Sequence, residues 1–207
     1  MAIISSKKEL KFYLMADRMM NRGTFKRGFA RRIIEVFFTD RIMAFLRSMR
    51  RYAYYKNKSG IISKLFSAYY YLRFRKWSHE LGFTIECDTL GYGVVIPHYG
   101  TIVVGKNKIG NYAVLQTSIC ISSNDKVIGD ALYVGTGAKI TTKIVLGDNV
   151  SIGANSLVNK SFPEGNCMIA GAPATIRKSE GPWYIRDGEY YTGLVKKVEK
   201  LKKEMGL

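Results

Sequence analysis

A six-residue repeat of aliphatic side chains is the feature that most restricts the fold of this 207-residue chain. Consecutive aliphatic residues stand six positions apart, and glycine or a small polar residue follows each one. They are Ile128, Val134, Ile140, Leu146, Ile152 and Val158. The register continues upstream, with one extra residue between 102 and 109 and another between 121 and 128, at Leu90, Ile96, Ile102, Ile109, Leu115 and Ile121. A fixed short period of this kind predicts stacked coils.

Three such units make one coil of about 18 residues, in which each aliphatic side chain points into a triangular prism. Backbone hydrogen bonds link one coil to the next at about 4.8 Å. A helix does not fit, because six does not match the period of about 3.6 and each interior glycine costs about 1 kcal/mol. An antiparallel sandwich would alternate with a period of two. We therefore predict a parallel β-helix, with about four coils between Leu90 and Val158.

The rest of the chain reads as helices and turns. Apolar residues recur at three- and four-residue intervals, with a break at Ser59–Gly60, in the segments Lys7–Arg18, Lys26–Arg50 and Ile61–Leu81. These helices are predicted to cover the N-terminal end of the stack. The turn-rich segments Phe162–Asn166 and Gly171–Ala174 are predicted to end the prism, and Glu189–Met205 to form a final amphipathic helix. We expect three parts: a basic helical region at 1–84, the β-helix at 85–178, and an extension with a helix at 179–207.

Positive charge is concentrated in the first 80 residues. The chain has 33 Lys and Arg against 16 Asp and Glu, and residues 1–80 hold 19 of the basic and 5 of the acidic ones. Basic, aromatic-rich stretches occur at Arg31–Phe38 and Tyr69–Trp77. They indicate either a solvated helical face packed within an oligomer, or attraction to an anionic membrane surface or an acidic glycan. No nucleic acid partner is expected.

Cysteine and histidine usage narrows the chemistry. The three cysteines are far apart and have no zinc or dithiol spacing, which indicates a reduced, cytoplasmic protein. No apolar run has the length of a signal peptide or a membrane span, so peripheral contact at the inner membrane face is the membrane-associated alternative.

The two histidines, His79 and His98, are too few for a zinc site with three histidine ligands, so no metal is predicted. No G-x-S-x-G motif indicates a covalent serine mechanism.

These residues resemble the hexapeptide-repeat acyltransferases, and within them the serine acetyltransferase-like branch that includes many polysaccharide O-acetyltransferases. The resemblance covers roughly residues 70–180. Its motifs, in order, are Tyr71–Lys76 with Leu81–Phe83, Gly91–Val104, Gly135–Ile140, Gly153–Val158 and Gly171–Ala174. It implies a left-handed β-helix, a homotrimer with its active site in the cleft between neighbouring prisms, and acetyl-CoA as the acyl donor.

The resemblance also implies site residues. His98, followed two positions later by Gly100, matches the catalytic histidine, and a neutral imidazole can accept the proton of an attacking hydroxyl. His79 is expected to be structural. The pantetheine arm is expected along Gly135, Thr136, Gly153 and Ala154, with the phosphates near Lys160 and Arg177. Direct transfer within a ternary complex is the simplest mechanism.

Two departures from the serine enzymes bear on the acceptor. Those enzymes usually pair the histidine with an acid less than one coil before it, but Phe83 and Thr84 stand at the matching positions, and Glu86 and Asp88 are the nearest acids. They also carry a longer loop with a second histidine, where this chain has only Ser122–Lys126. The predicted function is therefore acetyl-CoA-dependent O-acetylation of a sugar hydroxyl in cell-surface polysaccharide biosynthesis. The alternatives are a serine O-acetyltransferase of cysteine biosynthesis and a non-catalytic assembly module.

Overall fold

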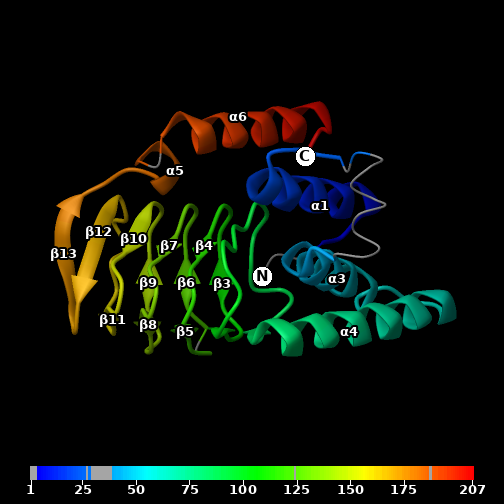
Figure 1. Ribbon diagram of the computed structural model, residues 1–207, viewed down its shortest axis with the longest axis horizontal. Coiled ribbons are helices and arrows are strands. Elements are labelled where there is room, and N and C mark those ends of the chain that lie inside the picture. Colours follow the sequence, from blue (N-terminus) through cyan, green and yellow to red (C-terminus); the bar gives the residue numbers. More distant parts are fainter. Residues whose placement is uncertain (1–3, 27, 29–38, 124, 187) are drawn as a thin grey trace.

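A three-sided parallel β-helix forms the body of the protein, with helices at both ends (Figure 1). The computed structural model describes residues 4–26, 28, 39–123, 125–186 and 188–207. Five strands stack on the first face of the prism, which corresponds to about five coils. The predicted fold, mainly β with helices before and after the solenoid, is confirmed. The left-handed sense of the coil stays a prediction.

Each face of the prism collects strands from successive coils. The first face holds β1 (Phe83–Ile85), β2 (Ile102–Val104), β5 (Ile119–Ile121), β8 (Lys139–Ile140) and β11 (Leu157–Val158). The second face holds β3 (Lys108–Ile109), β6 (Val127–Ile128) and β9 (Val145–Leu146). The third face holds β4 (Val114–Leu115), β7 (Tyr133–Val134), β10 (Val150–Ile152), β12 (Cys167–Gly171) and β13 (Ala174–Ser179).

The aliphatic repeat fills the prism as predicted, with one change of register. All twelve predicted core residues are buried, none more than 4% exposed. The first face, however, pairs Ile121 with Val104, and Val104 with Ile85. Ile102 pairs with Ile119 instead. The extra length that the sequence suggested after 102 therefore lies before it, in the turn between Ile96 and β2.

Helices α1 (Lys7–Arg22), α3 (Arg41–Tyr55) and α4 (Ile61–Leu81) pack at the N-terminal end of the stack (Figure 1). Helix α1 begins with a capping box between Ser6 and Glu9. Asp40 caps α3 by accepting a hydrogen bond from the backbone of Met43. Among the helices of the described residues, none is long and apolar enough to cross a bilayer.

The three N-terminal helices were predicted with differing accuracy. Helix α4 has the predicted bounds, and α1 runs four residues beyond the predicted Arg18. The prediction of one helix over Lys26–Arg50 was wrong at both ends, because Lys26 and Asp40 are not helical and α3 runs from Arg41 to Tyr55. Residues 27 and 29–38, which include the basic stretch Arg31–Phe38, lie outside the described part of the chain.

The C-terminal end differs from the prediction in one respect. Phe162–Asn166 does not end the prism, because Phe162 still pairs with Leu146 and the next strand, β12, pairs in parallel with β10. The turn at Gly171–Ala174 does end it, since β13 folds back antiparallel to β12. Helices α5 (Trp183–Arg186) and α6 (Glu189–Glu204) then run back over the third face.

Helix α6 and α1 together cover the outer side of the third face. Their buried residues, among them Phe12, Met20 and Val198, form a second apolar cluster with Tyr92 and Tyr112 of the first two coils. The Tyr92 and Tyr112 hydroxyls both donate to Glu199 of α6. The chain therefore returns to its own beginning after leaving the last coil.

We expect the inward stack to dominate the stability of the solenoid. Leu115 is completely buried, so Leu115→Ala should lower the free energy of unfolding by about 2–5 kcal/mol. Val127 points outward and is 46% exposed, so Val127→Ala should change it by about 0.5 kcal/mol or less. Urea denaturation of both variants measures the difference, and equal effects would contradict an inward-pointing stack.

Candidate functional site

The predicted catalytic and donor-binding residues mostly meet on one edge of the prism. We call the edge at which the chain passes from the third face to the first the His98 edge. Its corner segments, from the first coil to the fourth, are Pro97–Thr101, Gln116–Ser118, Gly135–Gly137 and Gly153–Asn155. Successive corners are linked by hydrogen bonds from Gly137 N to Thr117 O (3.1 Å) and from Asn155 N to Thr136 O (2.8 Å).

His98 lies on a bulge of this edge. The corner of the first coil has the five residues Pro97–Thr101, whereas the corner below it has the three residues Gln116–Ser118. Because the strands on either side stay in register, the two additional residues must project outward. Pro97, His98 and Tyr99 are accordingly all exposed. The imidazole can therefore reach a molecule bound against the edge.

Both ends of the bulge are fixed by contacts with helices. At its end, Gly100 N donates to Leu81 O at the C-terminus of α4 (3.0 Å). At its beginning, Ile96 N donates to Asn21 Oδ1 of α1 (3.1 Å), while Asn21 Nδ2 donates to Val94 O (2.7 Å). The backbone that carries His98 is thus held at both sides while its side chain stays free.

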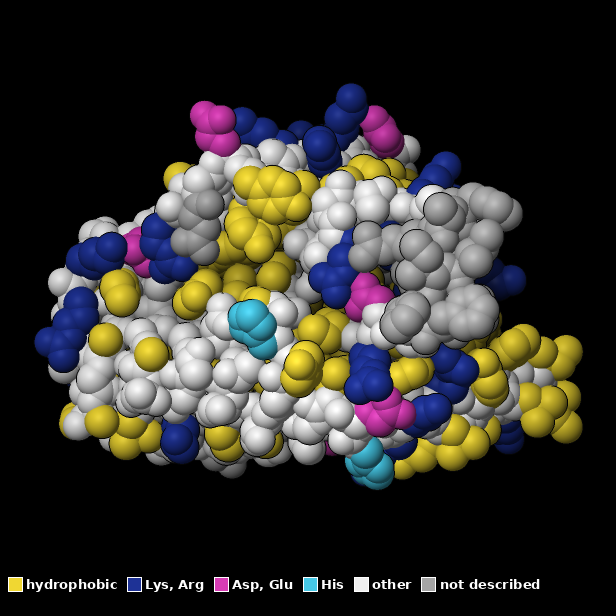
Figure 2. Space-filling model, viewed as in Figure 1, with side chains coloured by type: hydrophobic (Ala, Val, Ile, Leu, Met, Phe, Trp, Pro, Cys, Tyr) yellow, Lys and Arg dark blue, Asp and Glu magenta, His cyan; other side chains and the backbone are white. Residues whose placement is uncertain are grey.

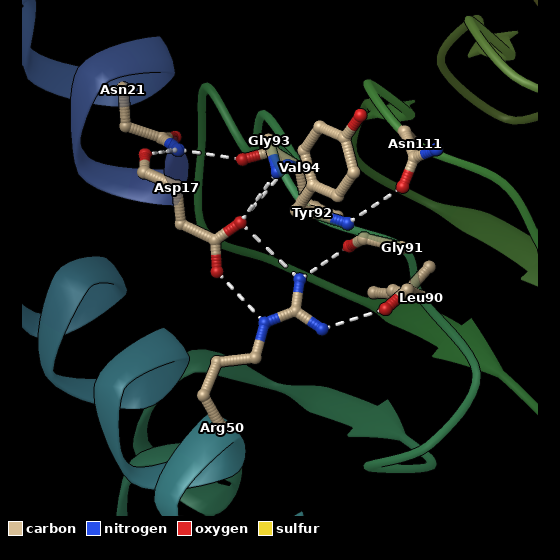
Figure 3. A network of polar contacts seen from close by, with 9 residues as sticks. All are labelled: Asp17, Asn21, Arg50, Leu90, Gly91, Tyr92, Gly93, Val94 and Asn111. Carbon is tan, nitrogen blue, oxygen red and sulfur yellow. Dashed lines mark hydrogen bonds and ion pairs between the residues drawn. The ribbon is translucent and has the colours of Figure 1, made fainter. Parts of the chain in front are cut away.

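A buried ion pair holds the segment just before the bulge (Figure 3). Asp17 of α1 and Arg50 of α3 are each about 1% exposed, and Arg50 Nε lies 2.8 Å from Asp17 Oδ2. Arg50 donates to the carbonyl oxygens of Leu90 and Gly91, and Asp17 Oδ1 accepts from Gly93 N at 2.9 Å. Each guanidinium nitrogen of Arg50 has a hydrogen-bond partner, so the buried charges are compensated.

Small residues follow the bulge along the edge. Gly135 is buried and Gly153 is half-buried, while Thr136 and Ala154 are exposed beside them. A Cβ on Gly153 would lie 2.9 Å from the Cβ of Ala170 in the next coil, so the coils approach closely here. The third and fourth coils thus have little side-chain volume on this edge, which suits a long, narrow ligand such as a pantetheine arm.

The two predicted phosphate-binding residues are not brought together within one chain. Arg177, on β13, donates from Nε to Ala170 O (3.2 Å), at the C-terminal end of the His98 edge. Lys160 follows β11 on the edge between the first and second faces, with its ammonium group 5.6 Å from the Phe162 ring centroid. Of these two residues, only Arg177 lies at the His98 edge of the same chain.

The acids considered as partners of His98 are on another edge. Glu86 and Asp88 follow β1, where the chain passes from the first face to the second, and Asp88 forms an ion pair with Lys56 of α3. Burial, reinforced by the charge of Asp88, raises the pKa of the neighbouring Cys87 thiol to about 11. That thiol therefore stays protonated near neutral pH and is a poor nucleophile. The His98 side chain makes no hydrogen bond or ion pair with the described residues.

A surface cavity of about 480 Å³ adjoins the bulge. Tyr99 borders it on one side, and Asp40, Arg41 and Glu80 from the facing ends of α3 and α4 border it on the other. Arg41 and Glu80 lie 3.8 Å apart, and Arg22 holds Asp40 through two hydrogen bonds of 2.7 and 2.9 Å. The cavity beside Tyr99 therefore carries both positive and negative side chains.

The second histidine lies on α4 and not on this edge. His79 lies in the last turn of α4, where its Nε2 is 3.1 Å from Arg75 Nη2. In Figure 2 the two histidine side chains are separate cyan groups on the surface. His79 is therefore a suitable control for substitutions at His98.

The sequence did not reveal the groups that fix the bulge. Asp17, Asn21 and Arg50 belong to helices far from His98 in the chain, and burial of charge marks only Asp17 and Arg50. The one available signal was the position of Asp17 between Ala16 and Met19 on the apolar side of a predicted helix. A charged residue on an apolar face is unusual unless it is paired.

Comparison with known proteins relates the solenoid to one enzyme group. No protein-family model matches the chain. The serine acetyltransferase of Synechococcus elongatus is 32% identical over 95 residues, which are 42% of this chain and 38% of the relative. That of Helicobacter pylori is 30% identical over 97 residues, 43% of this chain and 57% of the relative. The chain thus spans about two fifths to three fifths of the length of these curated relatives.

Solved structures agree in fold. The crystal structure of serine acetyltransferase from Brucella abortus has a TM-score of 0.58, with 21% identity over 84% of this chain and 68% of that one. A serine acetyltransferase in complex with CoA also has a TM-score of 0.58, with 20% identity over 81% of this chain and 67% of that one. The solenoid fits a hexapeptide-repeat acetyltransferase of the serine acetyltransferase-like branch. The resemblance noted in the sequence is thereby confirmed.

We predict that the buried ion pair stabilises the N-terminal coil strongly. Asp17→Asn removes the charge but keeps the shape, and it leaves Arg50 buried without a counter-charge. The free energy of unfolding should fall by about 3–5 kcal/mol, measured by urea denaturation. Glu204→Gln is the control, because the Lys200–Glu204 pair is exposed and should contribute about 1 kcal/mol or less. A similar small effect from both would contradict the role given to Asp17.

We also predict that bulk on the His98 edge obstructs the donor. Ala154→Trp should raise the Kd for coenzyme A by about tenfold, a loss of roughly 1.4 kcal/mol, measured by titration calorimetry. Lys197→Trp places the same side chain at an exposed position on α6, outside the prism, and should leave the Kd unchanged. Equal weakening by both variants would argue against the His98 edge as the donor groove.

Proposed function

We propose that the protein is an acetyl-CoA-dependent O-acetyltransferase with His98 as its general base. The observation that carries this proposal is the position of an exposed, backbone-anchored histidine at the head of an edge built from small residues. The similar curated proteins are named serine acetyltransferases, and two of the similar solved structures are described as complexes with CoA. Acetyl-CoA is accordingly the proposed donor.

The proposed donor groove runs from His98 along Gly135, Thr136, Gly153 and Ala154 towards Arg177. The thioester would lie near the bulge, and the guanidinium of Arg177 would meet a phosphate at the other end. Lys160, on another edge, would contribute only if a neighbouring copy brought its own edge to this groove. The trimer that the resemblance implies would supply such a neighbour, and the assembly therefore belongs to the proposal.

The proposed reaction is a direct transfer. The His98 imidazole takes the proton of the acceptor hydroxyl while the oxygen attacks the thioester carbonyl. The carbon–sulfur bond then breaks, the ester forms, and the imidazolium returns its proton to the leaving thiolate. No covalent enzyme intermediate is needed. The Cys87 thiol is not proposed as a nucleophile, because burial raises its pKa to about 11 and it lies on another edge than His98.

L-Serine is the acceptor that the comparisons favour, and it replaces a sugar as our first candidate. A solved serine acetyltransferase in complex with serine is among the similar structures, with a TM-score of 0.54. The cavity beside Tyr99 carries Arg41 and Glu80, which suit the carboxylate and ammonium groups of an amino acid. We propose that the acceptor enters through this cavity.

A sugar hydroxyl is the second candidate, and one observation favours it. The serine enzymes carry a longer loop with a histidine at the corner where this chain has only the five residues Ser122–Lys126. Lys126 is buried and donates to Ser122 O (2.7 Å) and Thr141 O (3.4 Å). The Lys126 ammonium group is therefore already bound within the chain and is not offered to a small amino acid.

We expect His98→Ala to lower kcat for acetyl transfer by about 10²–10⁴-fold, because the attacking hydroxyl loses its base. The measurement is thiol release from acetyl-CoA in the presence of L-serine or of a panel of sugars. His79→Ala removes the other histidine of the chain and should leave the rate unchanged. Equal rates for wild type and His98→Ala would rule out this base.

The same assay decides between the acceptors. Turnover with L-serine and none with sugars would support the first candidate, and the reverse would support the second. If no acceptor stimulates thiol release while coenzyme A still binds in calorimetry, the non-catalytic alternative replaces both.

A further inference from the structure

Helix α4 exposes a continuous apolar stripe to solvent. Its members lie within about 140° of the helix circumference, on the side away from the buried Phe74 and Leu81. They are 43–76% exposed and comprise Ile61, Ile62, Leu65, Phe66, Tyr69 and Leu72. In Figure 2, hydrophobic side chains (yellow) gather at the lower right, over the free end of α4. Apolar patches of this extent on a folded protein usually contact another surface.

A basic cleft borders the stripe. Arg47 and Arg51 of α3 and Arg73 of α4 surround a cavity of about 310 Å³, and Tyr69 belongs to both the cleft and the stripe. The guanidinium of Arg51 lies 5.4 Å from the Tyr70 ring, and that of Arg73 lies 5.9 Å from the Tyr69 ring. Neither Arg51 nor Arg73 forms an ion pair within the part of the chain that the structure describes. Within the same part, no carboxylate lines the cleft.

From these neighbouring features we infer that α4 docks on an anionic lipid surface. The stripe enters the boundary between head groups and acyl chains, and Arg51 and Arg73 receive lipid phosphates. Tyr69 lies between them, at the depth that tyrosine prefers in membrane interfaces. An apolar face beside arginines is the arrangement that holds amphipathic helices in a bilayer interface. This inference does not depend on the proposed acetyl transfer.

Charge favours a lipid over a second copy of the chain as the occupant. Residues 1–80 carry 19 basic against 5 acidic residues, and α4 itself has Glu80 as its one acid. Two copies joined through this face would bring like charges together, which weakens association. An anionic membrane instead attracts each arginine near its surface.

The test is sedimentation of the full chain with vesicles of phosphatidylcholine mixed with phosphatidylglycerol, compared with phosphatidylcholine alone. Wild type should bind the anionic vesicles and lose binding as sodium chloride is raised. Arg51→Gln with Arg73→Gln should weaken binding by about fivefold for each arginine removed. Lys143→Gln with Lys197→Gln removes the same charge from exposed positions outside α3 and α4 and should change binding by less than about twofold.

A second pair of variants tests the apolar stripe. Leu65→Ser with Leu72→Ser should also weaken binding to anionic vesicles. Ile176→Ser with Ile185→Ser changes two isoleucines that are each 61% exposed outside α4, and it should not weaken binding. Equal binding of wild type to neutral and anionic vesicles would overturn the proposal. So would a Leu65/Leu72 variant that keeps its vesicle binding but changes mass in analytical ultracentrifugation, because the stripe would then join copies of the chain.

Discussion

Stacking imposes one constraint on every coil of this protein: the chain must return to the same place beneath the coil before it. The inward aliphatic residues and the hydrogen bonds between coils both require that return. An additional residue therefore cannot remain in a strand and must leave the prism at an edge. The segment Pro97–Thr101 is such a departure, and it carries His98. The regularity of the fold and the exposure of its candidate catalytic residue thus have the same physical cause.

A bulge alone would not position a side chain, because a longer turn has more conformations available to it. The N-terminal helices supply the missing restraint. Asp17, Asn21 and Arg50 bind the backbone of residues 90–96, and the C-terminus of α4 binds Gly100. The helical region is therefore more than a cover for the end of the stack. It fixes the strand from which His98 projects, through polar groups that are buried and mutually satisfied.

Much of this arrangement was predictable from spacing, and the remainder depended on contacts between distant segments. The hexad repeat identified the inward residues, and the structure places His98, Gly135 and Gly153 on turns of the same edge. It misplaced the insertion near Ile102, because Ile102 and Val104 are both aliphatic and both face inward on β2. The ion pair of Asp17 and the return of α6 carry no periodic signal. Lys160 was grouped with Arg177 by resemblance alone. A single chain places the two residues on different edges.

The return of α6 to the N-terminal coils affects how the solenoid unfolds. A plain stack of coils is nearly one-dimensional, so its last coil can open without disturbing the first. Here Glu199 accepts hydrogen bonds from tyrosines of the first two coils, and Lys8 near the start of α1 donates to Gly206 near the end of the chain. Opening the C-terminal end therefore also uncovers the N-terminal coils. Contacts between the two ends of the stack thus couple its coils, so we expect the coils to unfold cooperatively and not one after another from one end.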